Sequence, residues 1–370
     1  MPTITSITTR RLFGLLSRPW APDVTGNHVI VVTVELSDGV QGTGFSWTPA
    51  IGASSIEAML RDELIPRAIG ADAEPEALWH ELWLAVHEAG GGGVTSIALA
   101  GIDTALWDAR ARRSGQNLAS HLGQVRETVP AYGSGINLHY STAELVAQNL
   151  RFAEAGSPAV KIKIGRPDLG DDLARIRAVR EAIGPDIALR VDANQRWNLA
   201  QASTAVEALA DLDIDWLEEP LRADDSLGYR ELAQRSAVPI AAGENLHTAY
   251  RFAELLEHGA LAVAQPNVVR VGGISPFLEI AALAQRHGAR LAPHLLPELA
   301  VPLALAVPHV ECVEVVEGAL LHEQGILAGG SPLAIADGAA RSTAELGLGL
   351  SFTTDSPSAS PTAPTEGARP

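Results

Sequence analysis

Residues 159–195 of the chain have the sequence AVKIKIGRPDLGDDLARIRAVREAIGPDIALRVDANQ, in which two short apolar runs flank an amphipathic segment. The runs AVKIKIG and IALRVDANQ are typical of buried strands, and residues 169–183 between them have helical spacing. A strand, a helix and a second strand in this order form a βα unit, whose strands lie parallel. This stretch therefore predicts a parallel sheet covered by helices.

The alternation of apolar runs and helical segments extends from residue 131 to about residue 316. The runs are YGSGI, AVKIKIG, IALRVDANQ, IDWLEEP, PIAAGEN, LAVAQPN, ARLAPH and CVEVV. A polar residue lies at or near the end of each run after the first, at intervals of about 20 to 30 residues: Lys163, Asp192, Glu218, Glu244, Asn267, His294 and Glu314. One βα unit takes roughly 30 residues, and eight units close into a (β/α)8 barrel with its active site at the C-terminal strand ends. We therefore expect an α/β fold with a modified TIM-type barrel.

An open, doubly wound sheet is the alternative fold for such a pattern. It normally begins with the glycine-rich phosphate loop G-x-G-x-x-G after its first strand. Gly133-Ser134-Gly135 lies in or at the end of such a strand, but the rest of the motif does not follow. The barrel is therefore the favoured prediction.

Residues 1–125 have a different pattern and are predicted to form a small α+β capping domain. Residues 29–36 have the composition of a strand, Asp38-Gly39 predicts a tight hairpin turn, and residues 40–47 would return as a second strand. Helical spacing follows in three segments, at residues 54–68, 74–88 and 95–114.

The barrel domain is assigned to residues 126–319. Residues 353–370 are rich in Pro, Ser and Ala and have no periodicity. This composition predicts a disordered tail, because it offers little apolar surface to bury.

The composition limits the partners and the location of the protein. The chain has 370 residues and a formal net charge of −17, which argues against a nucleic-acid partner because that needs clustered Lys and Arg. No stretch of about 18 apolar residues is uninterrupted, so a membrane span is not expected. Cys312 is the single cysteine, and the N-terminus lacks the features of a signal peptide. We therefore expect a cytoplasmic protein.

Three of the predicted strand ends carry carboxylates, Asp192, Glu218 and Glu244. Three acids at one barrel mouth would repel one another unless a cation lies between them, and an all-oxygen ligand set favours Mg²⁺. In WLEEP, the neighbouring acids Glu218 and Glu219 point to opposite faces of the strand. Only one of these two can be a direct ligand, and the sequence alone leaves both possibilities open.

Basic residues lie at other strand ends. Lys161 and Lys163 are two apart on one strand, so both face the barrel interior. Two ammonium groups near a divalent cation should lower each other's pKa, which would make one of them a usable base. His294 follows the seventh strand and is a further catalytic candidate, while His28 and His139 are weaker candidates that could approach the mouth.

The chain resembles the mandelate racemase subgroup of the enolase superfamily from about residue 5 to residue 350. The resemblance is carried by the order and spacing of AGIDTALWDARARRSGQNLASHLG, VKIKIG, VDANQRW, WLEEP, AAGEN, QPNVVRVGGI and APH. It implies an α+β capping domain over a modified barrel, with residues from about 320 to 352 returning to the cap.

The resemblance also implies roles for individual residues. It assigns the Mg²⁺ ligands to Asp192, Glu218 and Glu244, so that the first glutamate of WLEEP is the ligand. It makes Lys163 the base, with Lys161 beside it contacting the substrate carboxylate. His294 would be the acid or base on the opposite face of the substrate.

Further residues are placed near the substrate by the same resemblance. Glu314 falls where the family has an acidic group near the substrate carboxylate, and Asn194 falls where a polar side chain contacts the substrate. Capping loops near residues 20–28, with Trp20 and His28, and near residues 45–48 would close the site.

Asn267 is the one departure from the family pattern. The family pairs its histidine with an aspartate at this position, so we include Asn267 among the residues of the substrate site. An amide can orient an imidazole but cannot stabilise an imidazolium by charge. His294 is therefore expected to be a weaker base than in a His–Asp pair.

The resemblance implies Mg²⁺-dependent removal of the proton alpha to a carboxylate through an enediolate, with dehydration of a sugar acid, an aldonate or aldarate, as the leading activity. Racemisation or epimerisation of a 2-hydroxy acid and cycloisomerisation of a lactone are the alternatives. A further, remote alternative is a catalytically silent protein that binds a metal ion and an acid sugar. The partner would be a small carboxylate, and we expect the protein to form a homo-oligomer.

Overall fold

In the computed structural model, which describes residues 1–357, three antiparallel strands form the sheet of the N-terminal cap. These strands are β1(Ile4–Leu15), β2(Gly26–Leu36) and β3(Gln41–Thr48). The turn between β2 and β3 contains Gly39 at φ 82°, a left-handed conformation that glycine adopts without strain. The hairpin predicted at Asp38-Gly39 is therefore confirmed.

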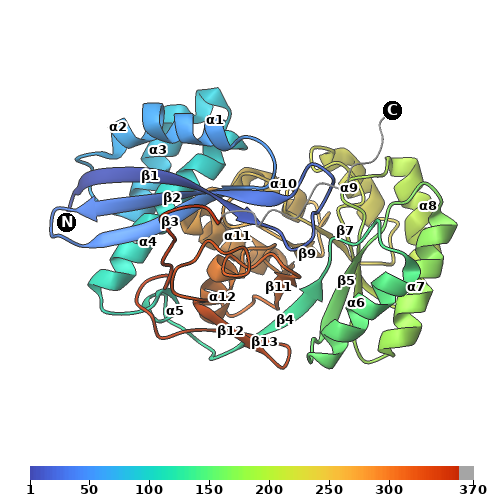
Figure 1. Cartoon of the computed structure of the whole chain (residues 1–370). Coiled ribbons are helices and arrows are strands. Elements are labelled where there is room, and N and C mark those ends of the chain that lie inside the picture. The colour runs from blue at the N-terminus through green and yellow to red at the C-terminus, as the bar shows by residue number, and fades with distance from the viewer. Residues whose placement is uncertain (358–370) are drawn as a thin grey trace, which may run out of the picture.

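The two faces of the cap sheet pack against different partners. Ile30 and Val32 belong to a core shared with the cap helices, whereas Val29, Phe45 and Trp47 belong to the core that continues into the barrel. Figure 1 shows the sheet between the cap helices and the barrel. The cap helices are α1(Ala53–Ala58), the π-helix η1(Met59–Leu64), α2(Ile65–Ala68), α3(Pro75–Val86), the short 3-10 helix η2(His87–Ala89), α4(Val94–Arg113) and α5(Leu118–His121).

Eight parallel strands form a closed barrel, as the sequence predicts. They are β4(Val129–Ser134), β5(Ala159–Lys163), β6(Ala188–Asp192), β7(Ile214–Glu218), β8(Ile240–Ala242), β9(Val263–Ala264), β10(Arg290–Leu291) and β11(Val313–Val316). Neighbours in sequence pair in parallel from β4 to β10, and β11 pairs with β4. A bridge between Leu291 and Val310 joins β10 to the segment before β11. This closure excludes the open doubly wound sheet.

Helices cover the outside of the barrel between successive strands. Two of them begin with capping boxes, in which Ser141 and Asn198 each accept a hydrogen bond from the third residue of their helix. The helices are α6(Thr142–Glu154), α7(Leu169–Ile183), α8(Leu199–Leu209), α9(Ser226–Ala233), α10(Ala249–Glu257), α11(Ile274–His287) and α12(Pro297–Ala306). Among residues 1–357 no helix is both long and apolar enough to cross a membrane.

The barrel interior is filled by a separate set of buried side chains, which we call the lower layer. Its members are Tyr132, Ala159, Arg190, Trp216, Ala241, Val263, Ala292 and Cys312. Side chains alternate along a strand, so the interior positions two residues further along β5, β6 and β7 are Lys161, Asp192 and Glu218. The packing of the lower layer thus fixes which side chains face the barrel mouth.

Helix α4 joins the cap to the barrel. The buried Asp103 carboxylate accepts hydrogen bonds from the backbone N–H groups of Ile274 and Ser275, at 2.6 and 3.1 Å, at the start of α11. One turn further on, the Asp108 carboxylate accepts from the N–H groups of Thr43 in β3 and Leu348, at 2.8 and 2.6 Å. A single helix therefore holds the cap sheet, a barrel helix and the C-terminal segment together.

The C-terminal segment contacts both parts of the molecule. The hairpin of β12(Leu333–Ala336) and β13(Ala339–Ser342) adds to β4 of the barrel, while Phe352 packs against Phe45 of the cap at 5.7 Å between ring centroids. Of the predicted tail, residues 353–357 are described, and the Ser356 hydroxyl accepts a hydrogen bond from the Phe13 N–H at 2.8 Å. Residues 358–370 of that tail lie outside the described residues.

Candidate active site

Three buried carboxylates converge at the barrel mouth. Asp192 ends β6, Glu218 ends β7 and Glu244 lies two residues beyond β8. Ligand oxygens of these three side chains all lie within 4.8 Å of one another. The structure thus brings together the three acids that the sequence singles out, in a set that could hold a hard cation.

The two acids of WLEEP have separate environments. Glu218 points into the barrel, where its Oε2 accepts from Gln265 Nε2 at 2.7 Å and from Trp216 Nε1 at 3.3 Å. Glu219 has a left-handed φ of 39° and its carboxylate accepts from Asn245 Nδ2 instead, at 2.9 and 3.1 Å. It is therefore Glu218 that lies with Asp192 and Glu244, while Glu219 lies behind them.

The acids are crowded enough to change their protonation. Burial, followed by the charge of Asp192, raises the pKa of Glu218 to about 8. Burial and then the Glu244 carboxylate raise the pKa of Glu219 well above its usual range. Removing a carboxylate from water disfavours its charged form, and a second nearby negative charge adds to this effect. The site therefore carries more negative charge than its own cations neutralise.

Lys161 and Lys163 both face this cluster from β5. Lys161 Nζ lies 2.7 Å from Glu218 Oε1 and 2.7 Å from Glu314 Oε1. Lys163 Nζ forms a very short ion pair with Asp192 Oδ2. Both lysines are buried, which agrees with the interior face predicted from their spacing.

The lysine pKa values differ from the sequence prediction. Burial is the largest effect on the pKa of Lys163 and lowers it, but the carboxylates of Asp192, Glu244 and Glu218 together outweigh burial and Lys161, so the pKa is raised. The pKa of Lys161 is raised well above its usual range, because Glu218 and Glu314 overcome its burial. The expected lowering of the Lys163 pKa by Lys161 exists, but the nearby carboxylates outweigh it in the protein alone. The prediction had counted a cation that would neutralise these acids.

Glu314, on β11, lies close to Lys161 and His294. Its Oε2 accepts a hydrogen bond from the Leu295 N–H at 3.0 Å. Burial acts to raise the pKa of Glu314, but Lys161 and His294 overcome this and lower it to about 2. Glu314 is therefore ionised throughout the neutral range and holds Lys161 at the mouth.

His294 contacts a different carboxylate of the cluster from the one that Lys163 contacts. Its Nε2 is 2.8 Å from Glu244 Oε2 and 3.8 Å from Glu314 Oε2. Its Nδ1 is 3.2 Å from Asn267 Nδ2. The structure therefore brings Asn267 next to His294. This is the position at which the family resemblance places the partner of the histidine.

The amide of Asn267 determines which nitrogen of the His294 ring carries the proton. Asn267 Oδ1 accepts from the N–H groups of Val269 and Arg270, at 3.1 and 3.0 Å, so its NH₂ group must face the ring. An amide NH₂ can only donate, so Nδ1 of neutral His294 must accept, and the ring proton lies on Nε2. Neutral His294 therefore presents a donor to the site at Nε2, and not a base.

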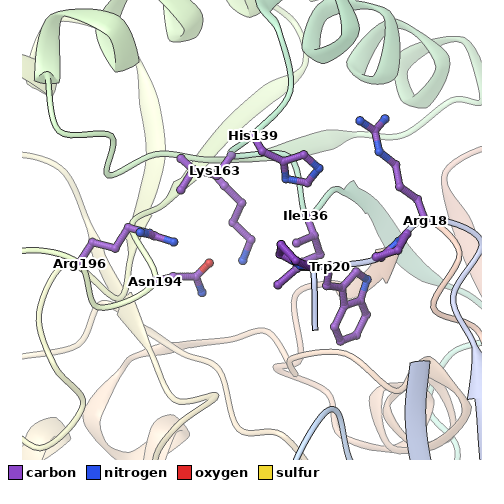
Figure 2. A pocket seen from close by; sticks show the side chains of 11 residues that line it. Arg18, Trp20, Ile136, His139, Lys163, Asn194 and Arg196 are labelled. Carbon is purple, nitrogen blue, oxygen red and sulfur yellow. The ribbon is translucent and has the colours of Figure 1, made fainter. Parts of the chain in front are cut away.

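A cavity of about 650 Å³ opens above Lys163 (Figure 2). It is lined by Arg18, Pro19, Trp20, Ala21 and Pro22 of the cap loop, by Ile136, Leu138 and His139 after β4, by Lys163, and by Asn194 and Arg196 after β6. Trp20 and Asn194, which the resemblance places near the substrate, thus both line this cavity. A volume of this size is within the range of small-molecule sites, roughly 300–1,000 Å³.

His28 is not brought to this cavity. It lies in β2 between Phe13 and Thr48, and its ring packs on Phe13 at 4.9 Å. Side-chain alternation gives His28 the same orientation as Ile30, toward the cap helices. The prediction that His28 approaches the substrate is therefore wrong, because it placed the residue by its nearness to the loop and not by its face of the sheet.

Two residues of the site were missed by the sequence reasoning. Gln265 holds Glu218 and is also buried, and it stands two residues before Asn267 in AVAQPN, so strand alternation offered a signal for it. Arg196 lies in VDANQRW beyond the strand end, where alternation no longer applies, and only the folded loop reveals that it lines the cavity.

Comparison with known proteins agrees with this fold. The family description "Mandelate racemase / muconate lactonizing enzyme, N-terminal domain" matches residues 21–123, and "Enolase C-terminal domain-like" matches residues 144–356. The capped barrel with acids and lysines at its mouth is therefore that of an enolase-type protein. The chain belongs to the mandelate racemase/muconate lactonizing enzyme family, which confirms the resemblance based on its motifs.

Two curated relatives illustrate the range of this family. A 3,6-anhydro-alpha-L-galactonate cycloisomerase from Streptomyces coelicolor is 37% identical over 84% of this chain and 85% of its own length. An L-talarate/galactarate dehydratase from Salmonella typhimurium is 36% identical over 76% of this chain and 71% of its own. Relatives with similar coverage thus include both a lyase and an isomerase.

Solved structures show the same architecture. An L-talarate dehydratase from Polaromonas sp. JS666, complexed with Mg and L-glucarate, superposes with a TM-score of 0.89 at 34% identity, over 96% of each chain. A racemase from Streptomyces coelicolor A3(2) with bound magnesium has a TM-score of 0.88 at 34% identity, over 94% of this chain and 97% of its own.

Proposed function

We propose that this chain is a Mg²⁺-dependent enzyme that removes the proton alpha to the carboxylate of a sugar acid and then breaks the bond from the β-carbon to its oxygen. The observation that carries the proposal is the set of three convergent carboxylates, with Lys163 in contact with Asp192 and His294 in contact with Glu244. Relatives named as sugar-acid dehydratases and cycloisomerases support the same chemistry.

The residues at the mouth fit a magnesium ion. Asp192, Glu218 and Glu244 would hold it, because their oxygens lie within 4.8 Å of one another and match the all-oxygen preference of Mg²⁺. The raised pKa of Glu218, about 8, is the sign of a buried acid cluster that lacks a compensating cation. When bound, the ion supplies positive charge beside the substrate carboxylate, where negative charge develops as the proton leaves.

Lys163 would accept the α-proton. A neutral amine is needed for this, and the Asp192 carboxylate is the largest effect that holds the pKa of Lys163 up. Neutralising the charges of Asp192, Glu218 and Glu244, which all raise this pKa, leaves burial and Lys161 to lower it. Lys161, held by Glu314, would face the substrate carboxylate and stabilise the enediolate formed when the C–H electrons move onto the carboxylate.

His294 would complete the reaction as a proton donor. The enediolate electrons form the double bond between the α- and β-carbons, and the C–O bond of the β-carbon breaks. The departing oxygen takes up one proton, for which the Nε2–H of His294 is the donor, and the α-proton gained by Lys163 replaces it, so that both side chains end neutral. The resulting enol then tautomerises to a 2-keto acid. The Asn267 hydrogen bond to Nδ1, which places the ring proton on Nε2, supports this role.

The same steps give two outcomes. If the β-oxygen is a free hydroxyl, water leaves and the reaction is a dehydration, which is the activity we propose. If that oxygen is part of a ring, it stays attached and the product is an isomer, and the 37% identical cycloisomerase keeps this second activity in consideration. Racemisation needs a second base at His294 and is disfavoured by the Nε2 proton.

The proposal is tested by incubating the Mg²⁺-loaded protein with a panel of aldonates, aldarates and their lactones or anhydro forms. Formation of a 2-keto acid with loss of water supports the dehydratase, and a 2-keto acid isomeric with its substrate supports the cycloisomerase. Exchange of the α-proton in D₂O without 2-keto product would indicate a racemase or epimerase. Binding without product or exchange for every acid would contradict the proposal and indicate a silent binding protein. Lys163→Ala serves as the control for contaminating activity.

A further inference from the structure

The outer part of the cavity differs in charge from the rest of the molecule. The chain has 44 acidic and 27 Lys or Arg residues, yet none of the cavity-lining residues is acidic. Four of them are basic side chains: Arg18, His139, Lys163 and Arg196. The field of an acidic chain opposes the entry of anions. A locally basic pocket supplies the positive charge that overcomes this field, so it favours an anionic ligand.

Arg196 is the cation of this pocket without a partner in the protein. Arg196 is an exposed residue, and its guanidinium forms no ion pair or hydrogen bond with any of residues 1–357. Arg18, by contrast, lies 3.3 Å from Glu144 and stacks on the Tyr140 ring at 3.6 Å. Figure 2 shows Arg196 directed toward the Lys163 side chain, with His139 on the other side of it.

The loop that carries Arg196 is fixed to the proposed metal site. Asn194 and Gln195 both have left-handed φ angles, 42° and 62°. The Asn194 N–H donates to Asp192 Oδ1 at 2.8 Å, and the Gln195 N–H donates to the Glu219 carbonyl at 2.7 Å. Two consecutive left-handed residues are strained unless such contacts hold them. Arg196 is thus held at a set place relative to the reacting end of a substrate.

The aliphatic part of the Arg196 side chain packs over a glycine. It crosses Gly165, where an added Cβ would come within 2.7 Å of Arg196 Cδ. Gly165 has a φ of 97°, which itself favours glycine. The glycine after the strand of Lys163 therefore lets the arginine side chain lie across the cavity wall.

We infer that Arg196, assisted by His139, binds a second, non-reacting carboxylate of the substrate, so that the enzyme prefers dicarboxylic sugar acids to the corresponding monocarboxylic ones. The inference rests on the proposed function, which places the reacting carboxylate near Lys161. The remaining carbon chain then extends past Lys163 and Asn194 into the basic part of the cavity. An arginine can form two parallel hydrogen bonds to a carboxylate, whereas a primary alcohol offers no charge to it.

The experiment uses pairs of substrates that differ only at the far carbon: galactarate with galactonate, and glucarate with gluconate. Values of kcat/KM and of Kd by calorimetry are measured with the Mg²⁺-loaded full chain. The diacid of at least one pair should be favoured by about tenfold or more, the range of one charge-assisted contact. Arg196→Gln should remove most of this preference through KM and Kd, with kcat nearly unchanged, and Arg196→Lys should retain part of it.

Two matched controls accompany these variants. Arg235→Gln removes an exposed arginine that pairs with Glu231 and does not line the cavity, so the preference should remain. Arg18→Gln should reduce the preference less than Arg196→Gln, because Arg18 is already paired with Glu144. Melting temperatures check that each variant is folded.

Turnover or binding of monoacids as good as that of diacids would overturn the inference and leave the proposed function intact. An equal loss for both members of a pair in Arg196→Gln, or an undiminished preference, would also overturn it. If no sugar acid in either these pairs or the wider panel binds or reacts, the proposed function fails and the inference fails with it.

Discussion

The barrel interior has two layers with buried cationic side chains, and the charge of these side chains is neutralised differently in each layer. In the lower layer, the Arg190 guanidinium lies between the rings of Trp216 and Tyr132, 3.7 and 4.3 Å from their centroids. It donates to Asp215 Oδ2 at 2.8 Å and contacts Cys312 Sγ at 3.3 Å. The aromatic faces and a carboxylate together satisfy this cation.

The upper layer, at the barrel mouth, lacks this balance. Lys161 and Lys163 face the carboxylates of Asp192, Glu218 and Glu314, while Glu244 lies against His294. The acids outnumber the lysines, and the pKa of Glu218 is raised to about 8 as a result of burial and of Asp192. Such a cluster is costly unless further positive charge arrives.

The difference separates structure from function within one barrel. The lower layer is complete with residues of the chain alone, and it sets the position of the strands. The upper layer has more acids than lysines, and the proposed Mg²⁺ would supply the further positive charge. Predictions that disturb one layer and leave the other intact test this distinction.

The largest effect is expected for Lys163→Ala in the upper layer. Loss of the base should reduce kcat by about 10²- to 10⁴-fold and abolish α-proton exchange with an accepted substrate. Exchange is followed by NMR in D₂O, and the melting temperature should change little. Lys161→Ala is the comparison: its effect should appear mainly in binding of the substrate carboxylate. Exchange that persists in Lys163→Ala would exclude this lysine as the base.

Arg190→Met should show the opposite behaviour. Removing the guanidinium loses its contacts with both rings and leaves Asp215 without this partner, so the free energy of unfolding should fall by about 2–3 kcal/mol. Urea denaturation measures the loss. Activity at saturating Mg²⁺ should fall far less than in Lys163→Ala. An unchanged stability would show that the lower layer does not depend on its cation.

The stability of the metal-free protein should depend on pH through Glu218. Its pKa in the folded state, about 8, exceeds the value of 4.5 for a free glutamate. The contribution of protonated Glu218 to the free energy of unfolding is complete below pH 4.5 and is lost as the pH rises toward and through 8. The free energy of unfolding should fall by up to about 1.4 kcal/mol per pH unit in this range. Mg²⁺ binding requires ionised Glu218, so in this range it should release a proton and grow tighter as the pH rises.

Calorimetry in buffers of different ionisation enthalpy measures this proton release, and urea denaturation between pH 5 and 9 measures the stability. Glu218→Gln is the control, because it cannot titrate and should make the dependence between pH 5 and 8 shallower than in the wild type. Part of the dependence should remain, because burial also raises the pKa values of Asp103 and Glu298 to about 7. A metal-free wild-type protein that becomes more stable across this window would contradict the account of the upper layer.

The smallest effect is expected for Asn267→Asp. A carboxylate accepts a hydrogen bond where the amide now donates one, so the proton of neutral His294 should move from Nε2 to Nδ1. His294 should then gain weak base activity, seen as slow α-proton exchange of the epimer whose proton faces it. Nitrogen chemical shifts of the ring report the tautomer, and Asn267→Ala controls for the loss of the amide alone. Identical ring shifts in wild type and Asn267→Asp would contradict the assignment.

Much of this organisation could be predicted from the sequence, because strand alternation is a local property. The pair Arg190 and Asp192 illustrates this: both lie in IALRVD two residues apart, so both must face the interior, one below the other. The same rule placed Lys161 and Lys163 correctly.

Other features depend on contacts that no local pattern contains. His28 was placed wrongly, since alternation shows that two faces exist but not which one meets the barrel. The proton on Nε2 of His294 depends on two backbone N–H groups that orient Asn267. The raised pKa of Lys163 depends on acids from other strands, which the sequence locates at the mouth without giving their distances.

The two carboxylates on α4 have a consequence for how the molecule unfolds. Separating the cap from the barrel would strip Asp103 from the start of α11 and Asp108 from the C-terminal segment, and would leave buried polar groups of all three without partners. The cap and barrel should therefore melt as one cooperative unit in spite of their separate sheets.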